Sequence, residues 1–250
     1  MLGHLMRRLL CAVLALLLAV SGAHAQLALT GAGKGVAGSA PSGLTCGTTS
    51  DNFNDGTKGA FWAATAAAPT TYGIGGYTLA GSATEGSGVV TVNGFSASTA
   101  QYQGYSSAST VTLASGTSIW VKPVPTGNIT AVLALQTGAS FFTRLEIDHL
   151  NGNISAANNN AGSGSTFWGS GASVPYSSTN HAWIGLRNTG SAIEAMTAPD
   201  ASGSPGTWTA QGATTSGYGS PANVTVGLWA VANNATPGSV TFEAWCTDTP

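Results

Sequence analysis

Two acidic side chains at alternate positions of one short segment have the types and spacing that acid–base chemistry on sugars requires. The segment Arg144-Leu-Glu-Ile-Asp-His-Leu-Asn151 places Glu146 and Asp148 two residues apart. On a β-strand, side chains two apart point to the same face, so both carboxylates would face one way and their apolar neighbours the other. Paired carboxyl groups about 5–5.5 Å apart carry out retaining glycoside hydrolysis. The alternative is an exposed strand face on which Arg144 and Glu146 form an ion pair of small energetic value.

A second group of residues suits sugar binding without catalysis. Phe167-Trp168 lies between an asparagine run, Asn158-Asn-Asn160, and Gly169-Ser-Gly171, so we expect a loop tryptophan flanked by amides. Aromatic rings pack against the apolar C–H faces of sugars, while amides hydrogen-bond to hydroxyl groups. The alternative is a tryptophan folded back over the edge of the fold. The predicted ligand-binding residues are Asn158, Asn159, Asn160, Trp168, Tyr176 and Trp208.

Oxygen-bearing side chains also gather near residue 50. Asp51, Asn52, Asn54 and Asp55 supply the hard oxygen ligands that Ca²⁺ prefers, so a structural calcium ion is one expectation for this loop. Turn and cap hydrogen bonds by the same side chains are the other. No His-Cys or His-His spacing indicates zinc, and no G-x-S-x-G motif indicates a serine nucleophile. We predict no other cofactor.

The composition excludes some partners and favours others. Charged residues make up 6% of the chain, against about 25% in typical soluble domains. No basic stripe with interleaved aromatic residues is present, so nucleic acid is excluded as a partner. Solubility must come from hydroxyl, amide and backbone groups, which also pair well with sugar hydroxyls. We therefore expect the partner to be a glycan or a cell-surface polysaccharide.

The first 25 residues have the three parts of a secretory signal peptide. Arg7 and Arg8 form the basic region, Leu9 to Val20 form an apolar run, and Ala23-His24-Ala25 forms a small-residue cleavage site. The apolar run is too short to span a membrane as a helix. We expect a secreted protein, extracellular or periplasmic, that does not span a membrane. Removing Arg7 and Arg8 leaves a net charge of about −4.

The remainder divides at Cys46. Residues 26–45 are rich in glycine and alanine and predict a flexible segment. Residues 46–250 contain short alternating apolar runs separated by turn residues, which predicts one all-β domain built as a two-sheet sandwich. Trp183 and Trp229 lie within such runs and are expected in the core. The strands are expected near residues 88–92, 109–113, 118–122, 129–135, 141–148, 182–187, 191–196, 223–229 and 239–245, with a hairpin turn at Asn188-Thr-Gly190.

The cysteines indicate one disulfide. Cys11 lies in the leader, whereas Cys46 and Cys246 lie close to the two ends of the predicted domain. In an exported protein, two such cysteines predict a Cys46–Cys246 bridge that joins the ends of the domain. We expect the first and last strands to be neighbours.

Three patterns resemble one fold family. Asp51-Asn-Phe-Asn-Asp55 with Trp62, the run from His181 to Arg187, and the closing strands around Trp229 resemble concanavalin A-like and laminin-G-like jelly-roll domains. The resemblance covers about residues 46–250 and implies an antiparallel two-sheet jelly roll. It also implies three classes of function: glycan-binding modules, glycoside hydrolases or polysaccharide lyases, and protein-binding or structural domains.

The resemblance also assigns roles within the acidic segment. In the glucanases of this superfamily the nucleophile opens an E-x-D-x-E or E-x-D-x-x-E motif whose last Glu is the general acid/base. Here Glu146 and Asp148 match, but the last position is Leu150 or Asn151, and neither can deliver a proton. We therefore favour a secreted, non-catalytic carbohydrate-binding or surface-interaction module. The alternatives are a divergent glycoside hydrolase or polysaccharide lyase acting through Glu146 and Asp148, and a structural or adhesion component of an extracellular or virion-type assembly.

Overall fold

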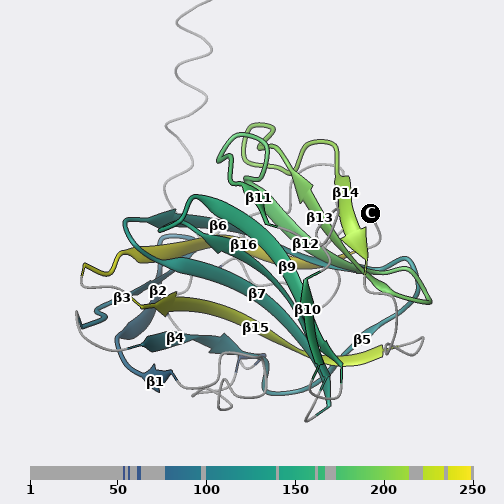
Figure 1. Ribbon diagram of the computed structural model, residues 1–250, viewed down its shortest axis with the longest axis horizontal. Coiled ribbons are helices and arrows are strands. Elements are labelled where there is room, and N and C mark those ends of the chain that lie inside the picture. The colour runs from purple at the N-terminus through teal and green to yellow at the C-terminus, as the bar shows by residue number, and fades with distance from the viewer. Residues whose placement is uncertain are drawn as a thin grey trace, which may run out of the picture. The chain divides into compact units, whose positions relative to one another are not determined.

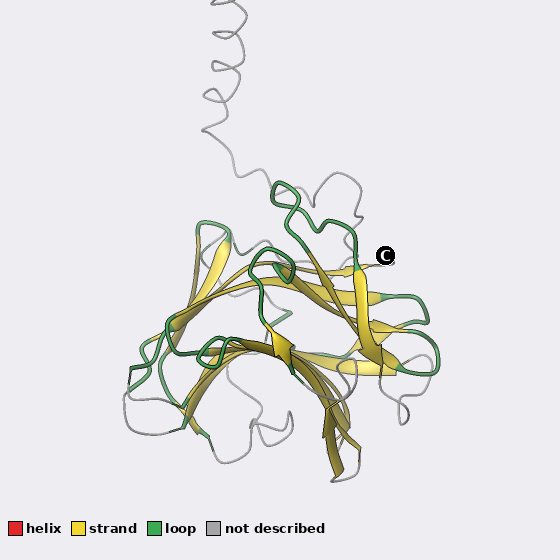
Figure 2. Ribbon diagram, turned by 45° about the horizontal axis from the view of Figure 1, so that its top comes forward, coloured by secondary structure: helices red, strands yellow, loops and turns green. Residues whose placement is uncertain are grey.

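In the part of the chain that the structure describes, sixteen β-strands form two sheets that face each other (Figures 1 and 2). The computed structural model describes residues 53, 56, 61–62, 77–96, 100–138, 141–160, 163–166, 173–213, 222–233 and 236–248. Over these residues every regular element is a strand, so none of the described segments is a helix able to cross a membrane. The predicted all-β sandwich is confirmed.

The larger sheet has nine strands and carries the candidate site. Along its main path the order is β1-β4-β15-β7-β8-β9-β10, with β5 beside β15 and β11 beside β9. All of its pairings are antiparallel except that of β1 with β4. Its strands are β1 (Thr78–Leu79), β4 (Gln101–Ser106), β5 (Val111–Leu113), β7 (Thr130–Gly138), β8 (Phe141–Asp148), β9 (Asn153–Asn160), β10 (Ser163–Thr166), β11 (Val174–Pro175) and β15 (Ala222–Ala232).

The smaller sheet has seven strands, all antiparallel, in the order β14-β13-β12-β6-β16-β3-β2. The last strand of the chain, β16, lies between β3 and β6. The residues next to Cys46 lie outside the described residues, so the expected pairing of the first and last strands of the domain stays a prediction. The strands are β2 (Ser82–Gly86), β3 (Val89–Asn93), β6 (Ser118–Thr126), β12 (Trp183–Asn188), β13 (Ile193–Ala198), β14 (Thr209–Ala213) and β16 (Ser239–Asp248).

The main core lies between the two sheets and follows from alternation along the strands. In β8, Leu145 and Ile147 are fully buried in this core, as predicted from their spacing. Phe53 and Trp62, from the family-like opening pattern, are also buried there, with ring centroids 6.4 Å apart. These two aromatic residues of the opening pattern therefore pack in the same core.

Two smaller apolar clusters lie on the outer faces of the sheets. Trp229 is buried as predicted, but its cluster is on the face of the nine-stranded sheet that points away from the other sheet. Trp183 is likewise buried with Trp120 on the outer face of the seven-stranded sheet. Alternation explains both positions, because each tryptophan is one residue away from side chains of the main core.

The asparagine run belongs to a β-strand. Asn158 to Asn160 complete β9, and Ser163–Thr166 form β10, which pairs with them in an antiparallel hairpin. No strand was predicted over residues 153–166, so both strands of this hairpin were missed, whereas the loop predicted at Phe167-Trp168 lies outside the described residues. The apolar face of β9 is limited to Ile154 and Ala156, and the strand continues through asparagines whose place in the sheet is fixed by backbone ladders to β8 and β10.

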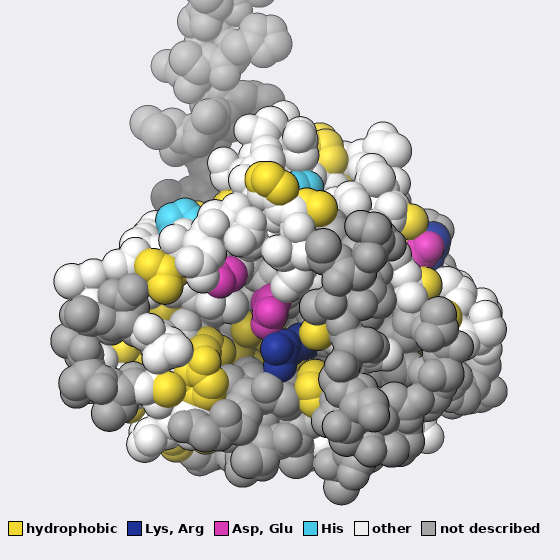
Figure 3. Space-filling model, viewed as in Figure 1, with side chains coloured by type: hydrophobic (Ala, Val, Ile, Leu, Met, Phe, Trp, Pro, Cys, Tyr) yellow, Lys and Arg dark blue, Asp and Glu magenta, His cyan; other side chains and the backbone are white. Residues whose placement is uncertain are grey.

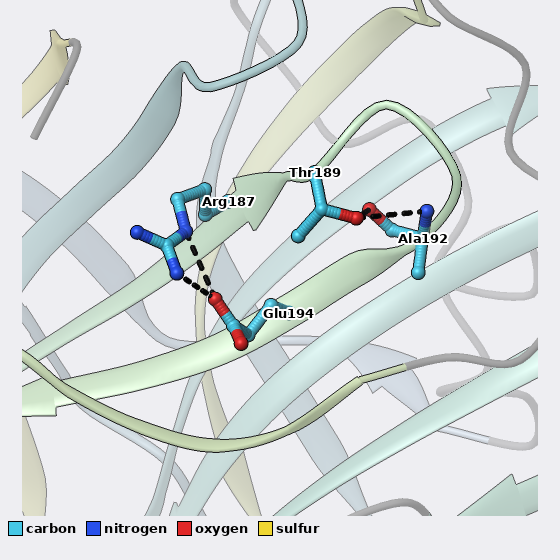
Figure 4. Close-up of polar contacts among 4 residues, drawn as sticks. All are labelled: Arg187, Thr189, Ala192 and Glu194. Carbon is cyan, nitrogen blue, oxygen red and sulfur yellow. Dashed lines mark hydrogen bonds and ion pairs between the residues drawn. The ribbon is translucent and has the colours of Figure 1, made fainter.

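The predicted hairpin turn joins β12 to β13. Gly190 has a φ of 92°, a conformation that glycine adopts at little cost. Across the turn, the Thr189 hydroxyl donates a hydrogen bond to the Ala192 carbonyl and accepts one from the Ala192 backbone N–H (Figure 4). Arg187 forms an ion pair with Glu194, its direct cross-strand partner (Figure 4). Arg187 Nε lies 2.9 Å from Glu194 Oε2. This ion pair on the smaller sheet is a useful control for the charged pair on β8.

Candidate functional site

The alternation of β8 places three charged side chains on one face of the nine-stranded sheet. Arg144, Glu146 and Asp148 point to the outer face, opposite to their core-facing neighbours. Val132 of β7 and Ser155 of β9 flank Glu146 in register. The prediction that the two carboxylates share a face is confirmed by this geometry. The sheet is curved, with its concave side turned away from the other sheet (Figure 2).

A shallow groove of about 210 Å³ follows this face. Acidic and basic side chains gather in the middle of the face, next to a hydrophobic patch (Figure 3). A second hollow of about 140 Å³ adjoins the groove and shares Tyr77, Thr130, Asp148 and Val231 with it. The groove is lined by Tyr77, Thr130, Val132, Arg144, Glu146, Asp148 and Val231.

A buried aromatic cluster supports the floor of the groove. Trp229 lies at the centre of this cluster and is 0% exposed. Tyr102 packs against its ring in an edge-on arrangement, with centroids 5.5 Å apart, and Tyr77 packs against the cluster from the groove side. The Trp229 indole lies across Gly227. A Cβ atom added to Gly227 would stand only 2.1 Å from Trp229 Nε1. The floor is therefore built on a close backbone–ring contact.

The Glu146 carboxylate is held by neighbours on both sides. Arg144 Nε lies 2.8 Å from Glu146 Oε2, so the predicted ion pair between these residues is confirmed. Ser155 Oγ donates a hydrogen bond of 3.1 Å to Glu146 Oε1. The Arg144 guanidinium also lies over the Phe142 ring, with 5.6 Å between Cζ and the ring centroid. The pair is thus fixed in position at the groove wall.

Asp148 ends the strand and caps the turn that follows. Its Oδ1 accepts a hydrogen bond from the backbone N–H of Asn151, and its Oδ2 accepts one from the Asn151 side-chain amide, at 3.1 and 2.6 Å. The position where a glucanase-like motif would carry its last Glu thus falls in the turn after β8. Leu150 is 43% exposed there. The strand itself supplies two carboxylates to the groove and no third.

Among the predicted ligand-binding residues whose side chains are described, Asn158, Tyr176 and Trp208 do not line this groove. Asn158 is buried, and Tyr176 is half-buried against the main core. Trp208 is half-buried on the other sheet, beside the cluster of Trp120 and Trp183. Asn159 and Asn160 lie at the end of β9. Trp168, the calcium candidates Asp51, Asn52, Asn54 and Asp55, and Cys46 lie outside the described residues.

Tyr176 lies between two histidines. Its ring centroid is 6.2 Å from that of His149 and 6.2 Å from that of His181. Burial raises the pKa of Tyr176 and lowers the pKa of His181, whose Nδ1 accepts a hydrogen bond from the Ser177 backbone. His149 binds the Gly127 carbonyl through its own Nδ1. These contacts explain both histidines as structural residues.

A polar cluster on the smaller sheet is satisfied internally. Lys122 Nζ lies 3.3 Å from Asp200 Oδ1 and 2.8 Å from Glu243 Oε2, and it sits over the Trp183 ring. Burial lowers the pKa of Lys122, but its hydrogen bonds and charge interactions with Glu243 and Asp200 raise the pKa above its ordinary value. Asp200 Oδ2 also accepts a hydrogen bond of 3.1 Å from the backbone N–H of Gly203.

Asp200 should make stability depend on pH. Burial raises the pKa of this carboxyl, but hydrogen bonds from Gly203, Trp183 and Lys122 and the Lys122 charge lower it below its ordinary value of 3.8. The stabilisation is therefore complete above that value and is lost as the pH falls through the lower pKa of the folded state. We expect Asp200→Asn to lower Tm at pH 7 by about 2–4 °C, from roughly 1 kcal/mol.

The measurement is a set of thermal melts of the wild type and Asp200→Asn between pH 7 and pH 2. The difference in Tm should shrink below about pH 4. A difference that stays constant over this range would contradict the role of the ionised carboxylate.

The charged residues of β8 could be predicted from the sequence, but the other residues that line the groove could not. Tyr77 follows a glycine-rich stretch and immediately precedes the two-residue strand β1, so no periodic pattern marks it. Thr130 and Val132 lie within a predicted strand, and Val231 lies two residues beyond the predicted end of β15; the outward positions of all three follow from alternation. What the sequence lacked was the strand order that places β15 beside β7 and β7 beside β8.

Two sheets in these orders, antiparallel except at the pairing of β1 with β4, have the architecture of the concanavalin A-like jelly-roll fold. Its predicted resemblance is thereby confirmed at the level of the fold. No protein-family model matches the chain, and no curated protein is similar to it in sequence. Among the described residues, no group of three or more His, Cys, Asp or Glu side chains could hold a metal ion.

Solved structures with the same fold include proteins that bind or cleave sugar polymers. The CBM2 module of the evolved Dit of Lactobacillus casei phage J-1 is 11% identical, with a TM-score of 0.56 over 80% of this chain and 94% of that one. Bacillus licheniformis β-glucanase is 14% identical, with a TM-score of 0.51 over 80% of this chain and 97% of the glucanase chain. Xylan β-1,4-xylosidase from Bacillus halodurans is 11% identical, with a TM-score of 0.50 over 80% of this chain. The chain spans 38% of the xylosidase's length. At these identities the likeness is one of fold.

Proposed function

We propose that this chain is a secreted, non-catalytic carbohydrate-binding module that holds a sugar chain in the groove on the outer face of the nine-stranded sheet. The groove itself is the observation that carries the proposal. It combines an aromatic wall at Tyr77, an apolar floor at Val132 and Val231, and fixed hydrogen-bonding groups along β8. Apolar surface with a few placed polar groups is the usual make-up of a small-molecule or sugar site.

The fold supports the same proposal. A carbohydrate-binding CBM2 module and enzymes named for β-glucan and xylan share the architecture of this chain. The fold alone does not choose between binding and cleavage, so the choice rests on the groove. There, Glu146 is paired with Arg144, and Asp148 is committed to the turn at Asn151. The position at which a glucanase-like motif carries its last Glu is Leu150 or Asn151 here, so β8 and its turn supply no third carboxylate.

Tyr77 should contribute most to binding. It lines both hollows and packs on the buried aromatic cluster, so its ring is held in position to receive a sugar face. We expect Tyr77→Ala to weaken binding of a soluble polysaccharide by about 10- to 100-fold, the range typical of a central aromatic contact. Isothermal titration with soluble β-glucan, xylan and mucin-type glycans measures the effect.

Two further variants serve as controls. Tyr77→Phe keeps the ring and should retain most of the affinity. Leu79→Ala removes an exposed apolar side chain two residues away, outside the groove, and should leave the affinity unchanged. Binding that is lost in Trp168→Ala but kept in Tyr77→Ala would move the site to the loop predicted from the sequence.

Cleavage is the second candidate, because Glu146 and Asp148 both face the groove. The same polymers should be assayed for release of reducing ends. Release that disappears in Glu146→Gln, but persists in the matched control Glu194→Gln on the other sheet, would replace the binding module with a divergent hydrolase.

A further inference from the structure

The groove carries an excess of negative charge. Its lining contains two carboxylates, Glu146 and Asp148, and one guanidinium, Arg144. The remaining wall residues of the groove and of the adjoining hollow are neutral. Since Arg144 lies 2.8 Å from Glu146, these two charges largely balance each other. The negative charge of Asp148 is then not balanced by any other side chain that lines the two hollows.

Asp148 occupies the point where the two hollows meet. It lines both of them, together with Tyr77 and Thr130. Its oxygens accept hydrogen bonds from neutral groups of Asn151, and no cationic side chain contacts it within the part of the chain that the structure describes. A chain lying through both hollows would pass this carboxylate.

We propose that the groove selects sugar chains by charge: it accepts uncharged polysaccharides and rejects polyanionic ones, such as those built from uronic acids. The inference rests on the proposed binding function and adds the ligand class to it. A uronate carboxylate near Asp148 would place like charges side by side at a partly dehydrated surface, which is strongly unfavourable. Amides and hydroxyls of Asn128, Thr130, Asn151 and Asn233 bind neutral hydroxyl groups without this penalty.

The experiment compares neutral and carboxylated forms of one polymer. The probes are β-glucan with its C6-oxidised form, and methyl-esterified homogalacturonan with its de-esterified form. At low salt the wild type should bind the neutral member at least about tenfold more tightly. Near 1 M NaCl the Debye length falls to about 3 Å, so the gap should narrow as the acidic member binds better.

Charge variants give an independent measurement. Glu146→Gln with Asp148→Asn leaves Arg144 as the one charged group of the groove, so affinity for the acidic polymers should rise about tenfold or more. The control Glu194→Gln with Glu243→Gln changes the charge of the whole molecule equally but lies on the other sheet. It should leave the affinity for the acidic polymers unchanged.

The outcomes separate the two proposals. If the wild type binds the carboxylated form as tightly as the neutral form at low salt, charge selection is overturned and the binding function stands. An equal gain in both double variants also overturns it, because the effect then belongs to the whole molecule. If no polymer binds, the binding function fails, and the charge inference fails with it.

Discussion

Replacing Trp229 with alanine should destabilise the protein by about 3–5 kcal/mol and abolish the groove. The indole is 0% exposed and is the centre of the cluster that supports Tyr77 and Val132. Removing it leaves a cavity under the sheet face that surrounding side chains can fill only in part. For a domain of this size the loss corresponds to a fall in Tm of roughly 6–20 °C, measured by calorimetry.

The contact between Trp229 and Gly227 allows a sharper test. Gly227→Ala would place a Cβ atom 2.1 Å from Trp229 Nε1, so the buried ring must move. We expect a loss of roughly 1–3 kcal/mol, typical of overpacking, and weaker glycan binding. In a Trp229→Ala background the same methyl group has room, so the added cost should fall close to zero. This non-additivity is the signature of direct contact.

Gly86→Ala is the matched control. Gly86 lies in β2 of the smaller sheet, and no atom lies within 4 Å of the position its Cβ would take. The control should therefore change stability little. Equal losses in Gly86→Ala and Gly227→Ala would mean that backbone effects, and not the ring contact, cause the destabilisation.

Alternation predicted the strands that bury apolar side chains. Strand β8 was predicted with its observed bounds because Leu145 and Ile147 alternate with charged residues. Strands β4 and β9 were missed, since glutamine, glycine, serine and asparagine dominate them and backbone ladders to neighbours decide their state. Local patterns report side-chain burial, whereas strands rich in polar residues are fixed by strand pairing that is distant in sequence.

In the candidate site, too, local sequence patterns predicted some residues, and strand pairing distant in sequence determined the others. The shared face of Glu146 and Asp148 follows from a two-residue spacing and was predictable. Tyr77 stands across the groove from them only because β1 joins the sheet beside β4, several strands away from β8. The burial of Trp229 was predicted, but its placement under the groove depends on which face of β15 is turned outward. Sequence thus identified the charged wall, and topology supplied the aromatic one.

Breaking the predicted Cys46–Cys246 disulfide should lower Tm by roughly 10–20 °C without abolishing the fold. Closing a loop of about 200 residues removes chain entropy from the unfolded state worth about 5 kcal/mol, and each kcal/mol shifts Tm by about 2–4 °C in a domain of this size. The fold should survive because the core between the sheets is extensive and does not include Cys246. Thermal melts of the exported protein with and without reductant measure the shift.

The double variant Cys46→Ala/Cys246→Ala is the control. Its Tm should be close to that of the reduced wild type and should not change when reductant is added. An unchanged melting curve on reduction of the wild type, or two titratable thiols in the oxidised protein, would refute the bridge.

The position of Cys246 changes what such a bridge would do. Cys246 is fully buried in β16, directly opposite Trp120 of β6, in the cluster on the outer face of the seven-stranded sheet. A bridge from this position would therefore attach to the Trp120 cluster and not to the main core. Reduction should therefore expose the Trp120 cluster before the strands separate. A red shift of tryptophan fluorescence that precedes the loss of β-sheet circular dichroism would reveal this order.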